Sequence, residues 1–169
     1  ERGFAQGAGT NGKGSTCAML ASILQAAGYR TGLYTSPFVN RFNERIALNG
    51  KFISDQDLVD IFERIRPIVD TMPRQPSEFE LITCAAMLYY KEQKCDVVVL
   101  EVGMGGEFDS TNVIDTPLLT IITAMGFDHM KYLGNTMTEI ASAKAGIIKP
   151  KGVTLIYGET PEADKVFRE

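Results

Sequence analysis

Cysteine and long apolar runs are both scarce in this 169-residue sequence. The three cysteines, Cys17, Cys84 and Cys95, are widely spaced within apolar stretches, which predicts buried thiols in a reducing compartment and no disulfide framework. No run approaches the ~18 apolar residues of a membrane-spanning helix, and the first residues lack the apolar core of a signal peptide. We therefore expect a cytoplasmic protein with no membrane partner.

Basic clusters and histidine are scarce as well. The formal net charge is −4 and the pI is near 5.1, and no group of lysines and arginines stands out, so nucleic acid is not an expected partner. His129 is the only histidine. The remaining composition, 44% hydrophobic and 22% charged, is ordinary for a soluble globular protein. The length fits one domain that buries roughly 70% of the surface of its unfolded chain.

The strongest single motif is the glycine-rich stretch at residues 7–16, Gly-Ala-Gly-Thr-Asn-Gly-Lys-Gly-Ser-Thr. Gly7, Gly12 and Lys13 have the G-x-x-x-x-G-K spacing of a phosphate-binding loop. Because glycines leave few side chains in the way, successive backbone N–H groups can turn toward an anion, and Lys13 adds a positive charge. We interpret the stretch as a nucleotide phosphate site, with an ordinary glycine-rich turn as the alternative.

The segment after this loop supports the same interpretation. Residues 15–27 are typical of a helix that ends at Gly28, so the loop lies at a helix N-terminus with its partial positive charge. One position departs from the usual pattern. Gly14 stands where Ser or Thr normally follows the lysine, and the hydroxyls of Ser15 and Thr16 come one and two residues late.

Three later stretches, at residues 29–35, 96–100 and 118–123, are typical of buried strands. Strands that alternate with helices form βαβ units. The sequence therefore predicts the α/β class, with a P-loop-containing, mostly parallel sheet that has helices on both faces. Ligands of such a sheet bind at the carboxyl ends of the strands.

Polar side chains occur at these predicted carboxyl ends. Glu101 directly follows a β-branched run, where strand packing requires no charge, whereas Mg²⁺ near nucleotide phosphates needs one or two carboxylates. Ser36 follows the first strand and His129 the third. The alternative for Ser36 is a serine in a turn. The alternative for His129 is a structural histidine, because Mg²⁺ prefers oxygen ligands. Glu101 is thus a predicted metal ligand, with a surface strand end as its alternative.

Other segments predict the frame around this site. Residues 45–53 are typical of a hairpin around an Asn-Gly type I′ turn. A helix with an apolar stripe begins after Ser54 and is ended or kinked at Pro67. Residues 77–80 form a Ser-x-x-Glu capping box that opens the next helix.

The two ends of the chain carry further expectations. Only residues 2–6 precede the phosphate loop, and they are weakly apolar, so a poorly formed strand and a piece of a longer protein are expected. A helix over residues 136–145, closed by Gly146, precedes a strand at residues 153–157. Lys144 lies in the last turn of that helix, where its charge complements the helix dipole and needs no other function.

A set of short motifs resembles one family, the folylpolyglutamate synthases of the Mur ligase superfamily of ATP-dependent amide ligases. The motifs occur in the family's order and run through most of the chain, at residues 8–16, 35–37, 41–46, 100–106, 109–112, 128–129 and 144–149. The family's loop also has glycine and then serine after the lysine, which accounts for the displaced serine here.

The resemblance implies roles for individual residues. ATP is expected to contact the loop residues Asn11, Gly12, Lys13, Gly14, Ser15 and Thr16. The family's magnesium ligands correspond to Ser36, Glu101 and His129. Lys144 corresponds to a carbamylated lysine, in which CO₂ turns the amine into an anion that can bind a second Mg²⁺. Lys13 and Lys144 are therefore the expected catalytic residues.

The resemblance also implies a reaction. The carboxylate of a folate attacks the γ-phosphate of ATP, an acyl phosphate forms, and the amine of L-glutamate displaces phosphate.

Two positions depart from the family's pattern. Glu107 stands where arginine is frequent, and Phe38 stands where histidine is frequent. Residues 1–169 are expected to be the ATP-binding central domain, truncated at the N-terminus, without the C-terminal ligase domain and inactive alone. The alternatives are a Mur-type ligase acting on a cell-wall precursor and a non-catalytic fragment that binds ATP and Mg²⁺.

Overall fold

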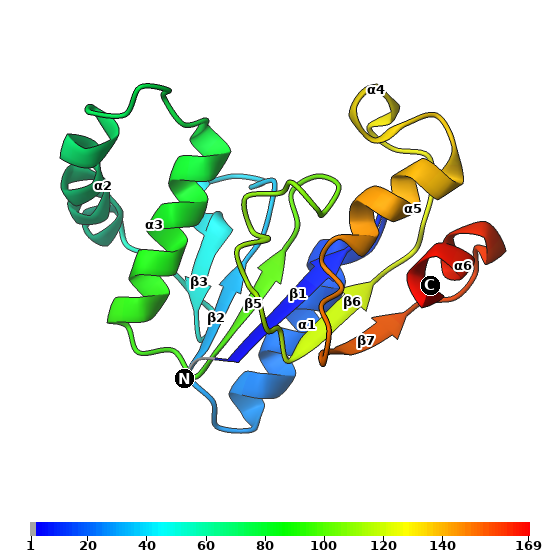
Figure 1. The fold of residues 1–169 in the computed structure, drawn as a ribbon. Helices are drawn as coiled ribbons and strands as arrows, with labels where there is room; N and C mark the ends of the chain where they lie inside the picture. Colours follow the sequence, from blue (N-terminus) through cyan, green and yellow to red (C-terminus); the bar gives the residue numbers. More distant parts are fainter. Residues whose placement is uncertain (1–2) are drawn as a thin grey trace.

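The fold is built around a single seven-stranded sheet (Figure 1). The computed structural model describes residues 3–169. The strand order of the sheet is β4-β3-β2-β5-β1-β6-β7. The strands of this sheet are β1 (Gly3–Ala8), β2 (Thr31–Tyr34), β3 (Ile46–Leu48), β4 (Lys51–Phe52), β5 (Val97–Glu101), β6 (Leu119–Ile122) and β7 (Val153–Ile156). The five strands from β2 to β7 in this order are parallel, and the β3–β4 hairpin adds two antiparallel strands at one edge. The predicted α/β class with a mostly parallel sheet is confirmed.

The central strand β1 corrects one expectation. The segment before the phosphate loop was expected to be poorly formed, but β1 pairs with both β5 and β6 and is buried over residues 5–8. Its small residues reflect close packing, because a Cβ on Gly3 would lie 2.4 Å from the Leu118 side chain and one on Gly7 2.9 Å from Cys17 Sγ. The low hydrophobicity of β1 therefore reflects the lack of space for larger side chains, and the strand is well formed. Arg2, which was included in that segment, lies outside the described residues.

Helices cover both faces of the sheet (Figure 1). They are α1 (Lys13–Ala26), α2 (Asp55–Val69), α3 (Glu78–Glu92), α4 (Met130–Leu133), α5 (Met137–Ala145) and α6 (Pro161–Arg168), with a 3₁₀ turn η1 at Phe42–Arg45. The alternation along β5 separates the two layers: Val99 packs against α1, whereas Val98 and Leu100 belong to the cluster under α2 and α3. α5 and α6 pack together over Ala8 and Ile122.

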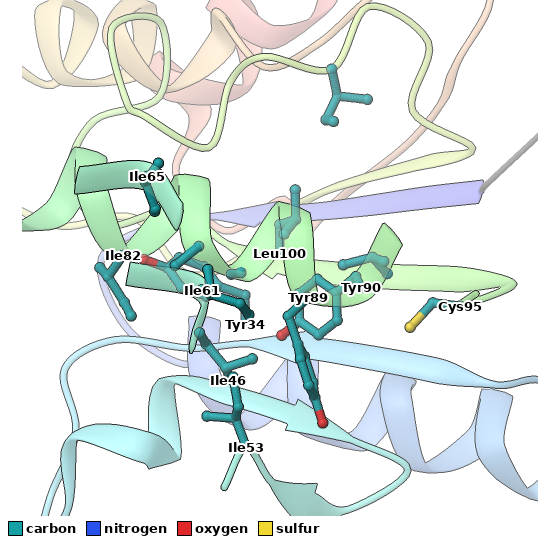
Figure 2. Packing of buried hydrophobic residues seen from close by; sticks show 14 residues of the cluster. Tyr34, Ile46, Ile53, Ile61, Ile65, Ile82, Tyr89, Tyr90, Cys95 and Leu100 are labelled. Carbon is teal, nitrogen blue, oxygen red and sulfur yellow. The ribbon is translucent and has the colours of Figure 1, made fainter. Parts of the chain in front are cut away.

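The cluster under α2 and α3 is built mainly from aromatic and β-branched side chains (Figure 2). The predicted apolar stripe of α2 lies here, with Ile61 and Ile65 buried. The helix does not end at Pro67, because the lost hydrogen bond falls in its last turn and α2 continues to Val69. The prediction of three buried thiols is wrong for Cys84, which faces solvent on α3, whereas Cys17 and Cys95 are buried.

The hairpin and caps match their predictions. Asn49 and Gly50 both have positive φ, 46° and 74°, as a type I′ turn requires. Ser54 caps α2, and Ser77 and Glu80 form the capping box of α3. None of the helices in the described part of the chain has the length and apolar character needed to cross a membrane.

Candidate active site

The phosphate loop lies between the end of β1 and the start of α1, as the motif predicts. Gly12 is the N-cap of α1 and has a left-handed φ of 82°, a conformation that is strained for any residue with a side chain. The Lys13 ammonium folds back over the loop and donates to the carbonyls of Gly9 and Thr10, each at 3.2 Å. The residues from Asn11 to Thr16 thus gather at the N-terminal end of one helix.

Ser36 and Glu101 meet because their strands are parallel neighbours. Tyr34 in β2 is in register with Leu100 in β5, so the residues that follow leave the sheet at the same edge. The Ser36 N–H donates to the Glu101 carboxylate at 2.9 Å. Burial raises the pKa of Glu101, and the Ser36 N–H and the charge of Lys13 oppose that shift.

His129 reaches the same place from β6. It begins α4 with a left-handed φ of 48°, and its Nε2 lies 3.6 Å from the Asp128 carboxylate. A cavity of about 540 Å³ is lined by Lys13, Ser36 and His129 among others. The structure therefore brings two of the three predicted metal ligands, Ser36 and His129, to one cavity, and Ser36 contacts the third, Glu101.

The donor set at this cavity fits a divalent cation. A hydroxyl, a carboxylate and an imidazole are all competent ligands, and a nearby cation stabilises the charged form of a buried carboxylate whose pKa is raised. Among residues 3–169, no three side chains drawn only from His, Cys, Asp and Glu lie together as metal ligands. A cation at this site would therefore depend on the Ser36 oxygen or on other oxygen donors.

Lys144 is buried, with 2% of its surface exposed, and its ammonium donates to the Gly9 carbonyl at 2.8 Å. Burial, together with the charge of Lys13, lowers the pKa of the Lys144 amine to about 8. Lys13, His129 and Lys144 line one narrow cleft. Lys144 lies in the last turn of α5, as the sequence predicts, and its side chain also contacts the phosphate loop, which the helix dipole does not explain.

Two glycines allow α5 to approach this closely. A Cβ on Gly106 would lie 2.8 Å from the carbonyl oxygens of Ala143 and Lys144, and one on Gly146 would lie 2.5 Å from the Cα of Glu107. The loop after β5 and the end of α5 therefore interlock through their backbones. Glu107, a departure from the family's pattern, donates its N–H to Ala143 at this junction, and its side chain is exposed.

Replacing Gly106 with alanine is expected to lower the free energy of unfolding by about 1–3 kcal/mol, because backbone atoms cannot move aside as a flexible side chain can. Urea denaturation measures the change. Gly28→Ala is the control, since its φ of 91° strains any side chain but a Cβ there meets nothing within 4 Å. Only Gly106→Ala is expected to change the chemical reactivity of Lys144. Stability equal to the wild type would contradict the interlock.

A polar network that the sequence reasoning missed supports the cavity wall. Gln6, buried in the middle of β1, donates to Thr111 Oγ1 at 3.0 Å, and Thr111 donates to Asp109 Oδ1 at 2.6 Å. The second Asp109 oxygen accepts the Met104 N–H at 2.8 Å. Asp109 lines the 540 Å³ cavity. A glutamine within a strand of small residues was the available signal.

Arg45 is a second missed residue of the same cavity. Its guanidinium carbon lies 5.3 Å from the centre of the Phe38 ring and 5.7 Å from that of Phe42, within the range of cation–π contacts. Phe38, the other departure from the family's pattern, therefore supports this arginine.

The chain is similar to proteins of one kind along nearly its whole length. Residues 8–168 match the family described as the Mur ligase middle domain. The dihydrofolate synthase/folylpolyglutamate synthase of Bacillus subtilis is 51% identical over 167 residues, which cover 95% of this chain and 38% of that protein. The folylpolyglutamate synthase of Lacticaseibacillus casei is 44% identical over 164 residues, which cover 94% of this chain and 38% of that protein.

Solved structures give the same result. The apo form of L. casei FPGS matches with a TM-score of 0.95 and 40% identity, over 99% of this chain and 42% of that chain. An FPGS–AMPPCP–folate complex matches with a TM-score of 0.95 and 40% identity, over 99% of this chain and 42% of that chain. This chain thus spans well under half the length of the relatives that it matches. Because the family match covers residues 8–168, nearly the whole chain, the chain belongs to the Mur ligase family and contains its middle domain.

Proposed function

We propose that this chain is the ATP-binding part of a folylpolyglutamate synthase, which joins L-glutamate to the carboxylate of a folate through an acyl phosphate. The observation that carries the proposal is the placement of Lys13, Ser36 and His129 around one cavity, with the Glu101 carboxylate bound to Ser36. The names of the similar proteins support the substrates. The proposed location is the cytoplasm, where ATP is available.

The phosphate loop accounts for nucleotide binding in this proposal. The loop leads directly into α1, whose N-terminal end lies at Lys13, where the helix dipole favours negative charge. A phosphate oxygen is a stronger, charge-assisted acceptor for Lys13 than the two carbonyls that it now contacts. Lys13 would therefore neutralise charge that accumulates on the γ-phosphate as the folate carboxylate attacks.

Ser36, Glu101 and His129 would hold Mg²⁺ beside those phosphates. The bound ion supplies positive charge to the phosphoryl oxygens. The residues do the positioning: the Ser36 N–H fixes the orientation of the Glu101 carboxylate, and burial of that carboxylate excludes water. Two negatively charged reactants must approach each other, so exact placement and positive charge supply most of the catalysis.

We further propose that Lys144 is carbamylated. The neutral amine attacks CO₂, a nitrogen–carbon bond forms, and one amine proton is released to solvent, so that a cation becomes an anion able to hold a second Mg²⁺. A lysine pKa of about 8 supports this step, because the neutral amine is then accessible near physiological pH. The short distance to the phosphate loop supports a catalytic position for the product.

The carbamate is expected to give a ¹³C NMR signal when the protein is equilibrated with ¹³C-labelled bicarbonate. The neutral fraction of a group with a pKa of about 8 is about a tenth at pH 7 and half near pH 8. The signal should therefore rise across this interval. Lys144→Arg should remove the signal and Lys149→Arg should keep it. A signal that survives Lys144→Arg would contradict the assignment.

The proposed reaction is tested by phosphate release from ATP in the full-length protein, since the chain spans only about 38% of its relatives. We propose that the rest of the protein, including a C-terminal domain, completes the nucleotide and glutamate sites, and that residues 1–169 alone are inactive. Release that requires both folate and L-glutamate supports the proposal. Release with a cell-wall precursor instead would identify another Mur-type ligase, and ATP binding without any release would identify a non-catalytic module.

A further inference from the structure

Thr10 connects the phosphate loop to a segment more than a hundred residues away in the sequence. Its hydroxyl donates to the Gly126 carbonyl and accepts the Gly126 N–H, both at 3.0 Å. The Thr10 side chain thus satisfies both the N–H and the carbonyl of Gly126, as the backbone of a neighbouring segment would otherwise do. Thr10 precedes the six predicted ATP contacts, and neither motif spacing nor resemblance assigned it a function.

Backbone contacts extend this connection along the same segment. The N–H groups of Thr10 and Asn11 both point to the Ala124 carbonyl, at 2.8 and 3.3 Å, and the Thr123 hydroxyl donates to the Ala8 carbonyl at 3.2 Å. A Cβ on Gly9 would lie 2.0 Å from Thr123 Oγ1, so the two segments are also in close van der Waals contact. These hydrogen bonds and contacts therefore hold the phosphate loop and residues 123–126 together.

The segment that Thr10 holds leads directly to a predicted metal ligand. His129 is three residues beyond Gly126, and its φ of 48° is a strained conformation for a residue with a side chain. Strained residues keep their conformation only where neighbouring structure holds them. The His129 carbonyl accepts the N–H groups of Tyr132 and Leu133 at 2.8 and 3.0 Å, so α4 holds His129 on one side. The Thr10–Gly126 hydrogen bonds hold the segment on its other side.

We propose that Thr10 is a positioning residue that couples the phosphate loop to His129, so that a nucleotide in the loop and a divalent cation at His129 stabilise each other. The proposal rests on the proposed function of His129 as a metal ligand. Nucleotide phosphates that order the loop also order residues 124–129, which presents the imidazole in a fixed orientation. Without the Thr10 hydroxyl, the two sites fill more independently.

The test compares Thr10→Val, which keeps the shape and removes the hydroxyl, with Thr10→Ser, which keeps the hydroxyl, in the full-length protein. Hydrogen exchange is measured with and without the ATP analogue AMPPCP and Mg²⁺. In the wild type and in Thr10→Ser, AMPPCP with Mg²⁺ is expected to protect residues 126–129. In Thr10→Val, the Gly126 amide is expected to exchange about tenfold faster and the added protection to be lost, because two hydrogen bonds are missing.

A second measurement separates positioning from a structural role. At saturating ATP, the Mg²⁺ concentration that gives half-maximal turnover is expected to rise about tenfold in Thr10→Val, with Thr10→Ser restoring it. An unchanged Mg²⁺ requirement together with retained protection of residues 126–129 would overturn the proposal. If Thr10→Val does not fold, the wild type still decides: protection confined to residues 9–16 overturns the coupling. Exchange with AMPPCP requires no folate, so this result is independent of whether the folate reaction is correct.

Discussion

Replacing Lys13 with alanine is expected to lower ATP-dependent turnover of the full-length protein by about 10²–10³-fold, as the loss of one preorganised electrostatic group does in other enzymes. The free energy of unfolding should change by no more than about 0.5 kcal/mol, since Lys13 is only partly buried and its ammonium contacts two loop carbonyls. A large kinetic effect with a small stability effect is the signature of a residue that acts on the nucleotide.

Lys149→Ala is the matched control. Its ammonium also donates to one backbone carbonyl, that of Gly146 at 2.9 Å, but it lies outside the phosphate loop. Its removal should leave turnover near the wild-type value. Lys13→Ala should also raise the pKa of Lys144, because the Lys13 charge now lowers it, and so reduce the ¹³C carbamate signal at a given pH. Normal turnover in Lys13→Ala would refute the role of the loop lysine.

Glu101→Gln is expected to lower turnover by about 10²–10³-fold and at the same time to leave the protein as stable as the wild type or more stable. The reason is the sign of the pKa shift. Burial raises the pKa of Glu101 above its ordinary value of 4.5, so stability is lost as pH rises from that value through the folded pKa, and ionised Glu101 opposes folding at neutral pH. Glutamine removes the charge and still accepts the Ser36 N–H.

Glu80→Gln is the control of opposite sign. Glu80 accepts the Ser77 N–H and hydroxyl at the start of α3, and these bonds lower its pKa. Its charge therefore stabilises the folded state above its unfolded pKa, and that stability is lost as pH falls through its folded value. Thermal unfolding at pH 7 should show Glu80→Gln less stable than wild type with near-normal turnover. A Glu101→Gln variant with wild-type turnover, or one that unfolds at neutral pH, is incompatible with a metal-binding carboxylate.

Local patterns were sufficient for most of the fold. The hairpin turn, the caps at Ser54 and Ser77 and the buried run at β5 depend on residues close in sequence, and the structure agrees with each. β1 was underestimated because its glycines are explained by side chains from distant segments, Leu118 and Cys17. The exposure of Cys84 likewise depends on which face of α3 meets the sheet.

The candidate site was predictable where a residue type is unusual for its position. Glu101 at the end of an apolar strand and Lys13 in a glycine-rich loop needed only the sequence. Lys144 was singled out only through the family resemblance, because its burial depends on the close approach of separate segments at Gly106 and Gly146. Thr10 and Gln6 were also missed, since their partners lie more than a hundred residues away and depend on the strand order.

The arrangement of ligands around a divalent cation is the central claim, and anomalous diffraction tests it most directly. Crystals of the full-length protein with AMPPCP and Mn²⁺ in place of Mg²⁺ would locate the ion by its anomalous signal. We expect an anomalous peak within coordination distance of the Ser36 hydroxyl, the Glu101 carboxylate and the His129 imidazole, beside phosphates held at Lys13, whether or not a second ion lies at Lys144. A peak that excludes Ser36 and Glu101, or nucleotide phosphates bound with no ion at these side chains, would contradict the account.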